Sequence, residues 1–233
     1  MREIDVWTVH LAGLPAGGEL LDAAERGRWQ RLRTAGLRDR FAAAHWARRR
    51  ILADHLGVDP AGLRFVTGRW GKPELANQGV FHSLSHSGGV AMVAVSHAAP
   101  VGVDVEALRP DLPAGRLART FFPPHEAGSV RAATDPVARY VRLWTRKEAA
   151  GKVTGIGLDR ALAIEVTDTT DTSDTTDTGG PVGRTVDVED PAGVPEPVRM
   201  TDIDAPDGFL AAVAMLGGAP VTVRSATLAP VPA

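Results

Sequence analysis

The segment GVDVE at residues 102–106 constrains the fold most, because it alternates apolar and acidic residues. A period of two predicts a strand whose Val103 and Val105 face a core. The same period places Asp104 and Glu106 on the opposite face, with Cα atoms about 6.6 Å apart. Two carboxylates this close repel each other, and a hard divalent cation is the usual partner that relieves the repulsion. A solvated strand face is the alternative interpretation.

A second motif, WTRKEAAGK at residues 144–152, has the spacing of a helix. Trp144, Glu148 and Lys152 recur every four residues and therefore share one stripe of that helix. A carboxylate and ammonium groups that face a pair of strand acids suit a metal-bound phosphate better than a packed core. An ordinary salt bridge between Glu148 and Lys152 is the alternative, since such pairs are common on helix surfaces.

A third cluster, FHSLSHSGG at residues 81–89, offers hydrogen-bond donors to phosphate oxygens. Ser85, His86 and the backbone N–H groups beside the glycine pair are groups of this kind. A Ser–His hydrolase is disfavoured because the segment has no Gly-x-Ser-x-Gly elbow. A helical zinc site is disfavoured because the glutamate of His-Glu-x-x-His is missing. Packing of an ordinary loop is the alternative.

Basic residues elsewhere add to the phosphate-binding interpretation. Lys72 lies on a rigid GKP turn, and Arg28 and Arg49 lie on segments expected to be basic helices. Most helical arginines are solvated surface charges, so none of them argues for a site by itself. Walker-type and Rossmann glycine loops are absent, which disfavours those two classes of nucleotide-binding protein.

The composition limits the class of protein. A chain of 233 residues can hold one large domain or two of about 100 residues each, and its 44% of hydrophobic residues can build a sizeable core. The absence of cysteine excludes disulfides, thiolate metal sites and a cysteine nucleophile. A net charge of −2 indicates neither nucleic acid nor an anionic membrane as a partner. The charged start MREID has no apolar signal segment, so we expect a cytoplasmic protein.

Apolar periodicity predicts an α+β chain. Helices are expected within residues 22–56, broken near Gly36 with Asp39 as the second N-cap, and from residue 121 into the helix that carries Glu148. Long helices that lead into antiparallel strands in each half predict two similar lobes with the active site in the cleft between them. Strands are expected at residues 4–10, 63–67, 81–87, 90–96, 101–106, 161–166, 185–188, 197–203, 209–215 and 221–228.

The lobe boundary is expected near residues 110–113, which divides the chain into residues 1–110 and 111–233. Residues 167–180 are rich in Thr and Asp and contain no apolar residue. Such a segment cannot offset its ordering entropy by burial, so it is expected to be a mobile insertion without a catalytic part.

In this order, the motifs resemble those of the surfactin-type (Sfp-like) 4′-phosphopantetheinyl transferases. The resemblance covers nearly the whole chain apart from the Thr/Asp-rich insertion, and the ordered set is far more specific than any single motif. Its length resembles that of the two-lobed members, whose lobes are related by a pseudo-two-fold axis, and a monomer is therefore expected. The matching segments are GKP at 71–73, LSHSG at 84–88, GVDVE at 102–106, FF with Glu126, and Trp144 with Lys147, Glu148 and Lys152.

The resemblance implies a reaction. A serine hydroxyl on an acyl or peptidyl carrier protein attacks the β-phosphate of coenzyme A, receives the 4′-phosphopantetheine arm and releases adenosine 3′,5′-bisphosphate. Asp104, Glu106 and Glu148 are expected to bind Mg²⁺, with Mn²⁺ as an alternative. Glu148, or Glu126 through a water, is expected to take the serine proton.

The resemblance also assigns the basic residues. Lys152 is expected to stabilise the pyrophosphate oxygens, with Lys147 as a second candidate. Phe121 and Phe122 are expected to belong to an apolar patch that docks the carrier protein. The phosphates of coenzyme A are expected on Lys72, Ser85 and His86, helped at the 3′-phosphate by Arg28 and Arg49.

The chain departs from the family pattern at two places. Ser83 stands where Asn is common before the Ser–His pair, and a basic residue usual in the first helix is replaced by Glu25 or displaced to Arg26. Two other functions stay open at this stage. One is a Mg²⁺-dependent hydrolase of a nucleotide pyrophosphate, and the other is a carrier-protein-binding module without chemistry.

Overall fold

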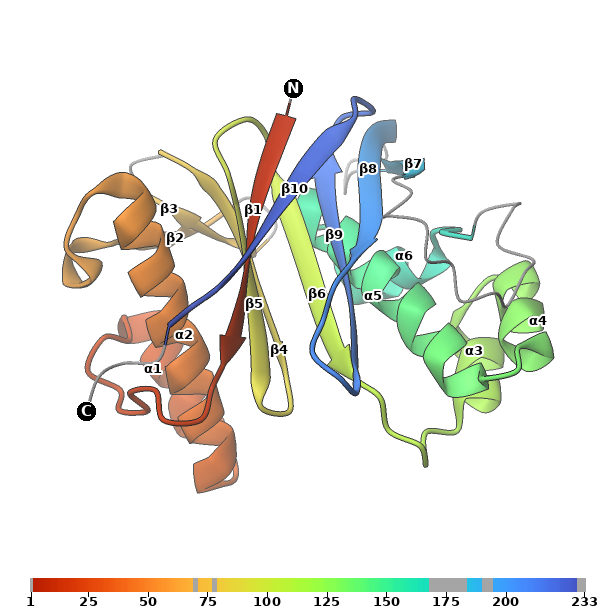
Figure 1. Ribbon diagram of the computed structural model, residues 1–233, viewed down its shortest axis with the longest axis horizontal. Coiled ribbons are helices and arrows are strands. Elements are labelled where there is room, and N and C mark those ends of the chain that lie inside the picture. The colour runs from red at the N-terminus through yellow and green to blue at the C-terminus, as the bar shows by residue number, and fades with distance from the viewer. Residues whose placement is uncertain (1, 69–70, 77–78, 168–183, 190–194, 230–233) are drawn as a thin grey trace.

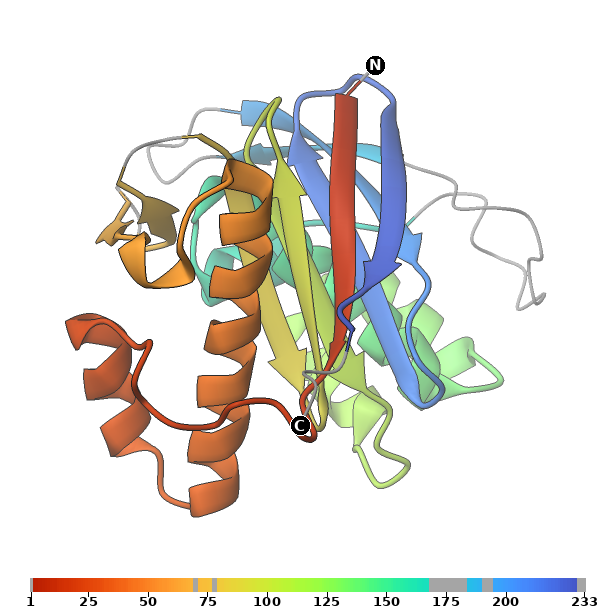
Figure 2. The same ribbon diagram turned by 60° about the vertical axis from the view of Figure 1, so that its left-hand side comes forward.

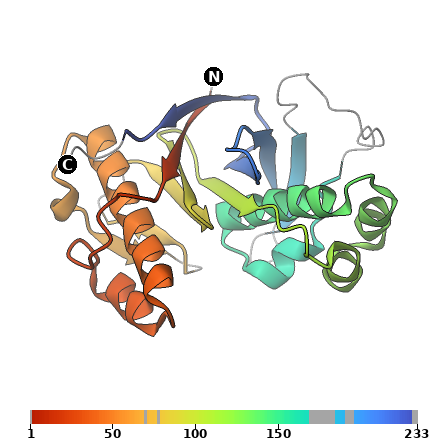
Figure 3. The same ribbon diagram turned by 60° about the horizontal axis from the view of Figure 1, so that its bottom comes forward.

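The computed structural model describes residues 2–68, 71–76, 79–167, 184–189 and 195–229. The predicted α+β class is confirmed: two four-stranded sheets lie side by side, and helices cover each of them on the outside (Figure 1). Figure 3 shows helices α1 and α2 in one half of the molecule and α3 to α6 in the other. The pseudo-two-fold relation between the halves stays a prediction.

The first sheet has the strand order β10-β1-β5-β4. It contains β1 (Arg2–His10), β4 (Phe81–Ser87), β5 (Val90–Ser96) and β10 (Val221–Thr227). The β4–β5 and β1–β5 pairs are antiparallel, whereas β10 from the end of the chain runs parallel to β1. Every residue of β5 is buried, as expected for the sequence VAMVAVS at the centre of a sheet.

Helices α1 (Ala23–Arg31) and α2 (Ala35–Leu56) belong to the first half, and α2 packs on its sheet (Figure 2). Asp22 caps α1, Thr34 caps α2, and Gly57 ends α2 in the left-handed conformation with a φ of 66°. The break predicted near Gly36 therefore lies two residues earlier, and Asp39 is inside α2 because Thr34 already supplies the cap. A short 3-10 helix (Pro60–Gly62) and the hairpin of β2 (Phe65–Thr67) and β3 (Pro73–Leu75) complete this half.

The second sheet has the order β6-β9-β8-β7 and is antiparallel throughout. Its strands are β6 (Val101–Ala107), β7 (Arg184–Glu189), β8 (Pro195–Ile203) and β9 (Phe209–Leu216). Helix α5 (Pro136–Thr154) lies across it, capped by Asp135 at its start and by Gly155 with a φ of 74° at its end. Helices α3 (Ala114–Phe121), α4 (Pro124–Ala132) and α6 (Leu158–Ala163) pack around α5.

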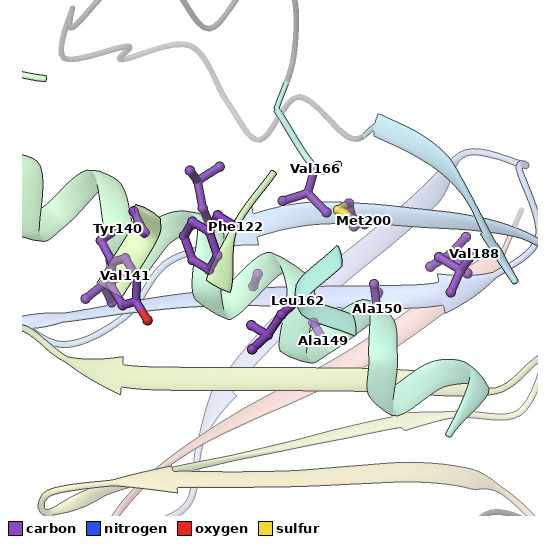
Figure 4. Close-up of a cluster of buried hydrophobic side chains, with 14 of the residues drawn as sticks. Phe122, Tyr140, Val141, Ala149, Ala150, Leu162, Val166, Val188 and Met200 are labelled. Carbon is purple, nitrogen blue, oxygen red and sulfur yellow. The ribbon is translucent and has the colours of Figure 1, made fainter. Parts of the chain in front are cut away.

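Apolar side chains between α5 and the second sheet form one of the three cores (Figure 4). Phe122 and Tyr140 stack in it with ring centroids 4.8 Å apart. Their neighbours include Val141, Ala149, Leu162, Val166 and Met200, all buried. This core fixes the rotation of α5, and with it the side of the helix that Glu148 and Lys152 occupy.

The two sheets meet where β4 runs beside β6. Alternate serines of β4 share one face of that strand and contact β6. Ser83 Oγ accepts from the Val103 N–H at 3.1 Å, and Ser87 Oγ accepts from the Ala107 N–H at 3.2 Å. The Ser-x-Ser-x-Ser spacing of residues 83–87 thus holds the acidic strand against the first half.

After α5 the fold departs from the predicted pattern in one element. The strand expected at 161–166 is wrong: residues 158–163 form helix α6, which starts after Gly157 and is too short for a helical period to show in the sequence. The Thr/Asp-rich insertion at 167–180 lies outside the described residues from residue 168 on. The boundary at 110/111 stays a prediction, while β10 of the later part pairs with β1 of the earlier part.

Candidate active site

A pocket of about 490 Å³ lies between the two halves, and residues from both of them line it. The first half contributes basic and hydroxyl groups, and the second contributes the end of α5 and the start of α6. The lining residues that matter here are Arg28, His45, Arg48, Lys72, Ser85 and His86 from the first half, and Glu148, Gly151, Lys152 and Leu158 from the second. The predicted cleft between the halves is therefore present.

Asp104 lies directly behind this wall and is only 3% exposed. Its Oδ1 accepts from Ser85 Oγ at 2.7 Å and from Lys152 Nζ at 2.7 Å. Its Oδ2 is buried and has no hydrogen-bond partner within the described part of the chain. A buried carboxylate oxygen without a partner is costly, so this atom is suited to a ligand that supplies positive charge.

Glu106 and Glu148 complete an acidic group with Asp104. Glu106 Oε2 accepts from Ser87 Oγ at 2.6 Å, and burial together with the charge of Asp104 raises the pKa of Glu106. Burial also raises the pKa of Glu148, helped by the charges of Asp104 and Glu106 and opposed by Lys152. The charges of Asp104 and Glu106 thus act on Glu148 across the β6–α5 contact, and a cation would relieve this repulsion.

In this conformation the three carboxylates do not converge on one point. No group of three or more His, Cys, Asp or Glu side chains among residues 2–68, 71–76, 79–167, 184–189 and 195–229 is arranged to hold a metal ion. The chemistry of the donor set nevertheless fits a hard divalent cation, because it combines a partnerless buried oxygen with two carboxylates whose pKa values are raised.

Two lysines hold the backbone of β6 at the edge of the pocket. Lys152 Nζ donates to the Val103 carbonyl at 3.1 Å besides its pair with Asp104. Lys72 Nζ donates to the Val101 carbonyl at 2.5 Å. Burial lowers the pKa of Lys72 to about 8, and nearby Glu74 opposes this shift. Both ammonium groups are within the pocket wall, where the sequence places phosphate contacts.

Glu126 and Lys147 are not brought to the pocket. Both side chains are completely buried, and Lys147 Nζ lies 2.5 Å from Glu126 Oε2. Lys147 also donates to the Ile164 carbonyl, and Glu126 Oε1 accepts from the Val166 N–H at 2.6 Å. The reason is helical geometry, because neighbouring residues on a helix point in directions about 100° apart. Glu148 faces the pocket and Lys147 therefore faces the core.

Of the two arginines expected to bind the 3′-phosphate, Arg28 lines the pocket and Arg49 does not. Arg28 and Arg48 line the pocket, whereas Arg49 donates away from it, to the Leu63 carbonyl at 3.0 Å and to Glu25 Oε2 at 2.8 Å. Arg48 and His45 were not singled out from the sequence. A signal existed, because both lie on the face of α2 that also carries buried Ala44 and Leu52, where a charged residue requires a specific partner.

Of the two phenylalanines expected to dock the carrier protein, only one lies on the surface. Phe121 is 48% exposed at the end of α3, but Phe122 is buried in the core beneath it. Only Phe121 can therefore belong to a surface that touches a partner.

Comparison with known proteins agrees with the family resemblance of the motifs. The model of the 4′-phosphopantetheinyl transferase superfamily matches residues 100–192, a span that includes Asp104, Glu106, Glu148 and Lys152. The 4′-phosphopantetheinyl transferase HetI of Nostoc sp. is 34% identical over 177 residues, which cover 72% of this chain and 75% of that protein. The 4′-phosphopantetheinyl transferase of Bacillus subtilis is 31% identical over 157 residues, covering 61% and 69%. No helix in the described part of the chain is both long and apolar enough to cross a membrane.

Proposed function

Because the chain belongs to the 4′-phosphopantetheinyl transferase superfamily, we propose that it modifies an acyl or peptidyl carrier protein with the arm of coenzyme A. The serine oxygen of the carrier forms a bond to the β-phosphorus of coenzyme A. The bond from that phosphorus to the bridging oxygen breaks, and adenosine 3′,5′-bisphosphate leaves. The serine proton is taken up by a base of the enzyme.

One observation carries this proposal: a single pocket joins a basic end to an acidic end. Arg28 and Arg48 lie at the basic end, and Glu148 and Lys152 lie at the acidic end. Coenzyme A needs this division, since its diphosphate must meet the reacting groups while its 3′-phosphate is bound elsewhere. Ser85 and His86 lie in the same wall, and Lys72 is beside them.

Glu148 is the residue that we propose as the base. Its carboxylate lines the pocket, where the serine of a bound carrier protein can reach it. Glu126 is a weaker choice, because its side chain is completely buried and paired with Lys147. Lys152 is proposed to neutralise charge on the diphosphate oxygens.

Asp104, Glu106 and Glu148 are the residues that we propose to hold Mg²⁺ or Mn²⁺. The partnerless Oδ2 of Asp104 and the mutual repulsion of the three carboxylates support this assignment. When bound, the cation supplies positive charge against the diphosphate of coenzyme A. Ser85 and Ser87 orient the two strand carboxylates through hydrogen bonds of 2.7 and 2.6 Å.

The test is an incubation of the protein with coenzyme A, Mg²⁺ and an apo carrier protein, followed by intact mass measurement of the carrier. We expect a mass gain of one phosphopantetheine arm and stoichiometric release of adenosine 3′,5′-bisphosphate. Release of the bisphosphate without any carrier would instead indicate a hydrolase. Binding of the carrier with no mass gain would indicate a non-catalytic module.

Two further features belong to the proposal. We expect the protein to act in the cytoplasm as a monomer, which size-exclusion chromatography with light scattering tests. We expect exposed Phe121 to contact the carrier protein. Phe121→Ser should then raise the KM for the carrier and leave the KM for coenzyme A unchanged.

A further inference from the structure

We propose that Glu25 is a positioning residue that holds Arg48 in place for the 3′-phosphate of coenzyme A. This inference rests on the proposed function and concerns the basic end of the same pocket. Glu25 lies on α1 and is 5% exposed, in the helix where the family resemblance implies a basic residue that is here replaced by Glu25 or displaced to Arg26. An acid at the anion-binding end of a pocket requires an explanation.

The contacts of Glu25 supply it, because both carboxylate oxygens are fully used. Oε1 accepts from Arg48 Nη2 and lies 2.8 Å from His45 Nδ1. Oε2 accepts from Arg49 Nη2 at 2.8 Å and from the Asp22 N–H at 2.8 Å, which closes the capping box of α1. One carboxylate therefore fastens two arginines of α2 to the first turn of α1, and the two helices lie side by side (Figure 2).

Arg48 is held by a carboxylate and by an aromatic ring. Its guanidinium carbon lies 4.0 Å from the centroid of the Phe65 ring, and its side chain is 3% exposed. Its Nε is buried and without a hydrogen-bond partner among the residues described. Arg48 also lines the pocket, so a ligand bound there can reach its guanidinium group.

Charge favours an anion at this place. Arg49 pairs with Asp22 and Glu25, Arg48 pairs with Glu25, and the charge of Arg28 acts on Arg48. Burial lowers the pKa of His45 to about 4, so His45 is neutral at pH 7 and donates from Nδ1 to Glu25. The cluster is therefore left with one excess positive charge, which a phosphate group would balance.

The 3′-phosphate fits this end better than the diphosphate does. The charges that act on Arg48 are those of Glu25, Arg49, Asp22 and Arg28, whereas those that act on Glu148 are Asp104, Lys152 and Glu106. Arg48 thus responds mainly to the charges of α1 and α2, and Glu148 mainly to those of β6 and α5. Since the diphosphate must lie at the acidic end where the chemistry takes place, the remaining phosphate lies at the basic end.

Glu25→Gln tests the positioning role, because charge alone and positioning predict opposite changes in coenzyme A affinity. Gln at the same position still closes the capping box, so the start of α1 is kept. Loss of the negative charge raises the net positive charge of the cluster, and charge alone would tighten coenzyme A binding. A positioning role predicts weaker binding, because Arg48 loses the carboxylate that holds it in place. We expect the Kd for coenzyme A, measured by calorimetry, to rise about tenfold, the cost of one charge-assisted hydrogen bond, while kcat stays within about twofold.

Three comparisons complete the experiment. In an Arg48→Gln background, Glu25→Gln should add no further loss; additive losses would show a merely structural role. The Kd for dephospho-coenzyme A should not change, and an equal loss with both donors would overturn the assignment to the 3′-phosphate. Asp54→Asn is the matched control, since it removes an exposed carboxylate paired with Arg50 on the same helix and should change nothing.

The inference and the proposed function fail in different ways. If the unmodified protein neither binds coenzyme A nor modifies a carrier, the proposed function is wrong. If it does both and Glu25→Gln binds coenzyme A as tightly or more tightly, the positioning role alone is wrong. Should Glu25→Gln not fold, Glu25→Asp keeps the charge but is one methylene shorter, and the same rise in Kd is expected.

Discussion

Lys152 on helix α5 donates from Nζ to Oδ1 of Asp104 on strand β6 at 2.7 Å, and this ion pair joins the two elements at the acidic end of the pocket. The Lys152 side chain keeps 28% exposure, while that of Asp104 keeps 5%. Asp104 is therefore the fixed member of the pair and Lys152 the one with access to a ligand. A divalent cation and this ammonium would share the charge of one carboxylate.

Lys152→Met should separate the contribution of Lys152 to the rate of transfer from its competition with a cation for Asp104. We expect the rate of transfer to fall on the order of 10²–10³-fold, because a preorganised charge on the diphosphate is lost. Cation binding should not weaken, since a competitor for Asp104 is removed. Steady-state kinetics and Mn²⁺ titration measure the two quantities separately. An unchanged rate would contradict the assignment of Lys152, and Lys152→Arg should retain more activity than Lys152→Met because it keeps the charge.

Lys72 should make coenzyme A binding depend on pH. Its pKa is lowered to about 8, so the ammonium is charged below that pH and loses its charge above it. The Kd for coenzyme A should therefore rise as the pH is increased through about 8. Lys72→Arg is the control, because a guanidinium stays charged over this range and should remove the dependence. A pH profile that is the same in both proteins would show that Lys72 does not hold a phosphate.

Gly102 sets the distance between β6 and α5. A Cβ at this position would lie 2.0 Å from the Ala149 carbonyl oxygen and 3.1 Å from Lys152 Cβ. Gly102→Ala should push the strand from the helix and lower the free energy of unfolding by about 1–3 kcal/mol or more, measured by denaturant titration. Gly89→Ala is the matched control, since nothing lies within 4 Å of its added Cβ. Equal stabilities would show that the β6–α5 contact is looser than described.

The Glu126–Lys147 pair should act on stability and not on binding. Lys147→Met leaves a buried carboxylate unpaired and is expected to cost about 3–5 kcal/mol of unfolding free energy. The double variant with Glu126→Gln should lose less than the sum of the two single variants, because neither charge is then left alone. The KM for coenzyme A should stay unchanged in the folded protein. A raised KM with normal stability would show that Lys147 contributes to coenzyme A binding after all.

Much of the fold follows from local patterns in the sequence. The bounds of β4 and β5 are the predicted ones, because a tight Gly-Gly turn separates two runs of suitable residues. The parallel pairing of β1 with β10 joins the two ends of the chain and has no local signature. Helix α6 was missed because its six residues span fewer than two helical turns, too few for a helical period to show in the sequence.

The acidic end of the site could be predicted because periodicity alone places its residues. A strand period puts Asp104 and Glu106 on one face, and a helix period puts Glu148 and Lys152 on one stripe. The basic end depends on tertiary contacts. Glu25 binds both Arg48 and Arg49, but only Arg49 also donates to the Leu63 carbonyl, away from the pocket. Lys147 is likewise held in the core by Glu126 on α4.

Counting bound Mn²⁺ by electron paramagnetic resonance, in the presence of coenzyme A, tests most directly whether Asp104, Glu106 and Glu148 hold one divalent cation. We predict one tightly bound ion per chain in the unmodified protein, and loss of that ion in both Asp104→Asn and Glu148→Gln, with Asp111→Asn on the exposed loop after β6 as the control. Stoichiometric Mn²⁺ binding that survives both substitutions, in folded protein, would contradict the account.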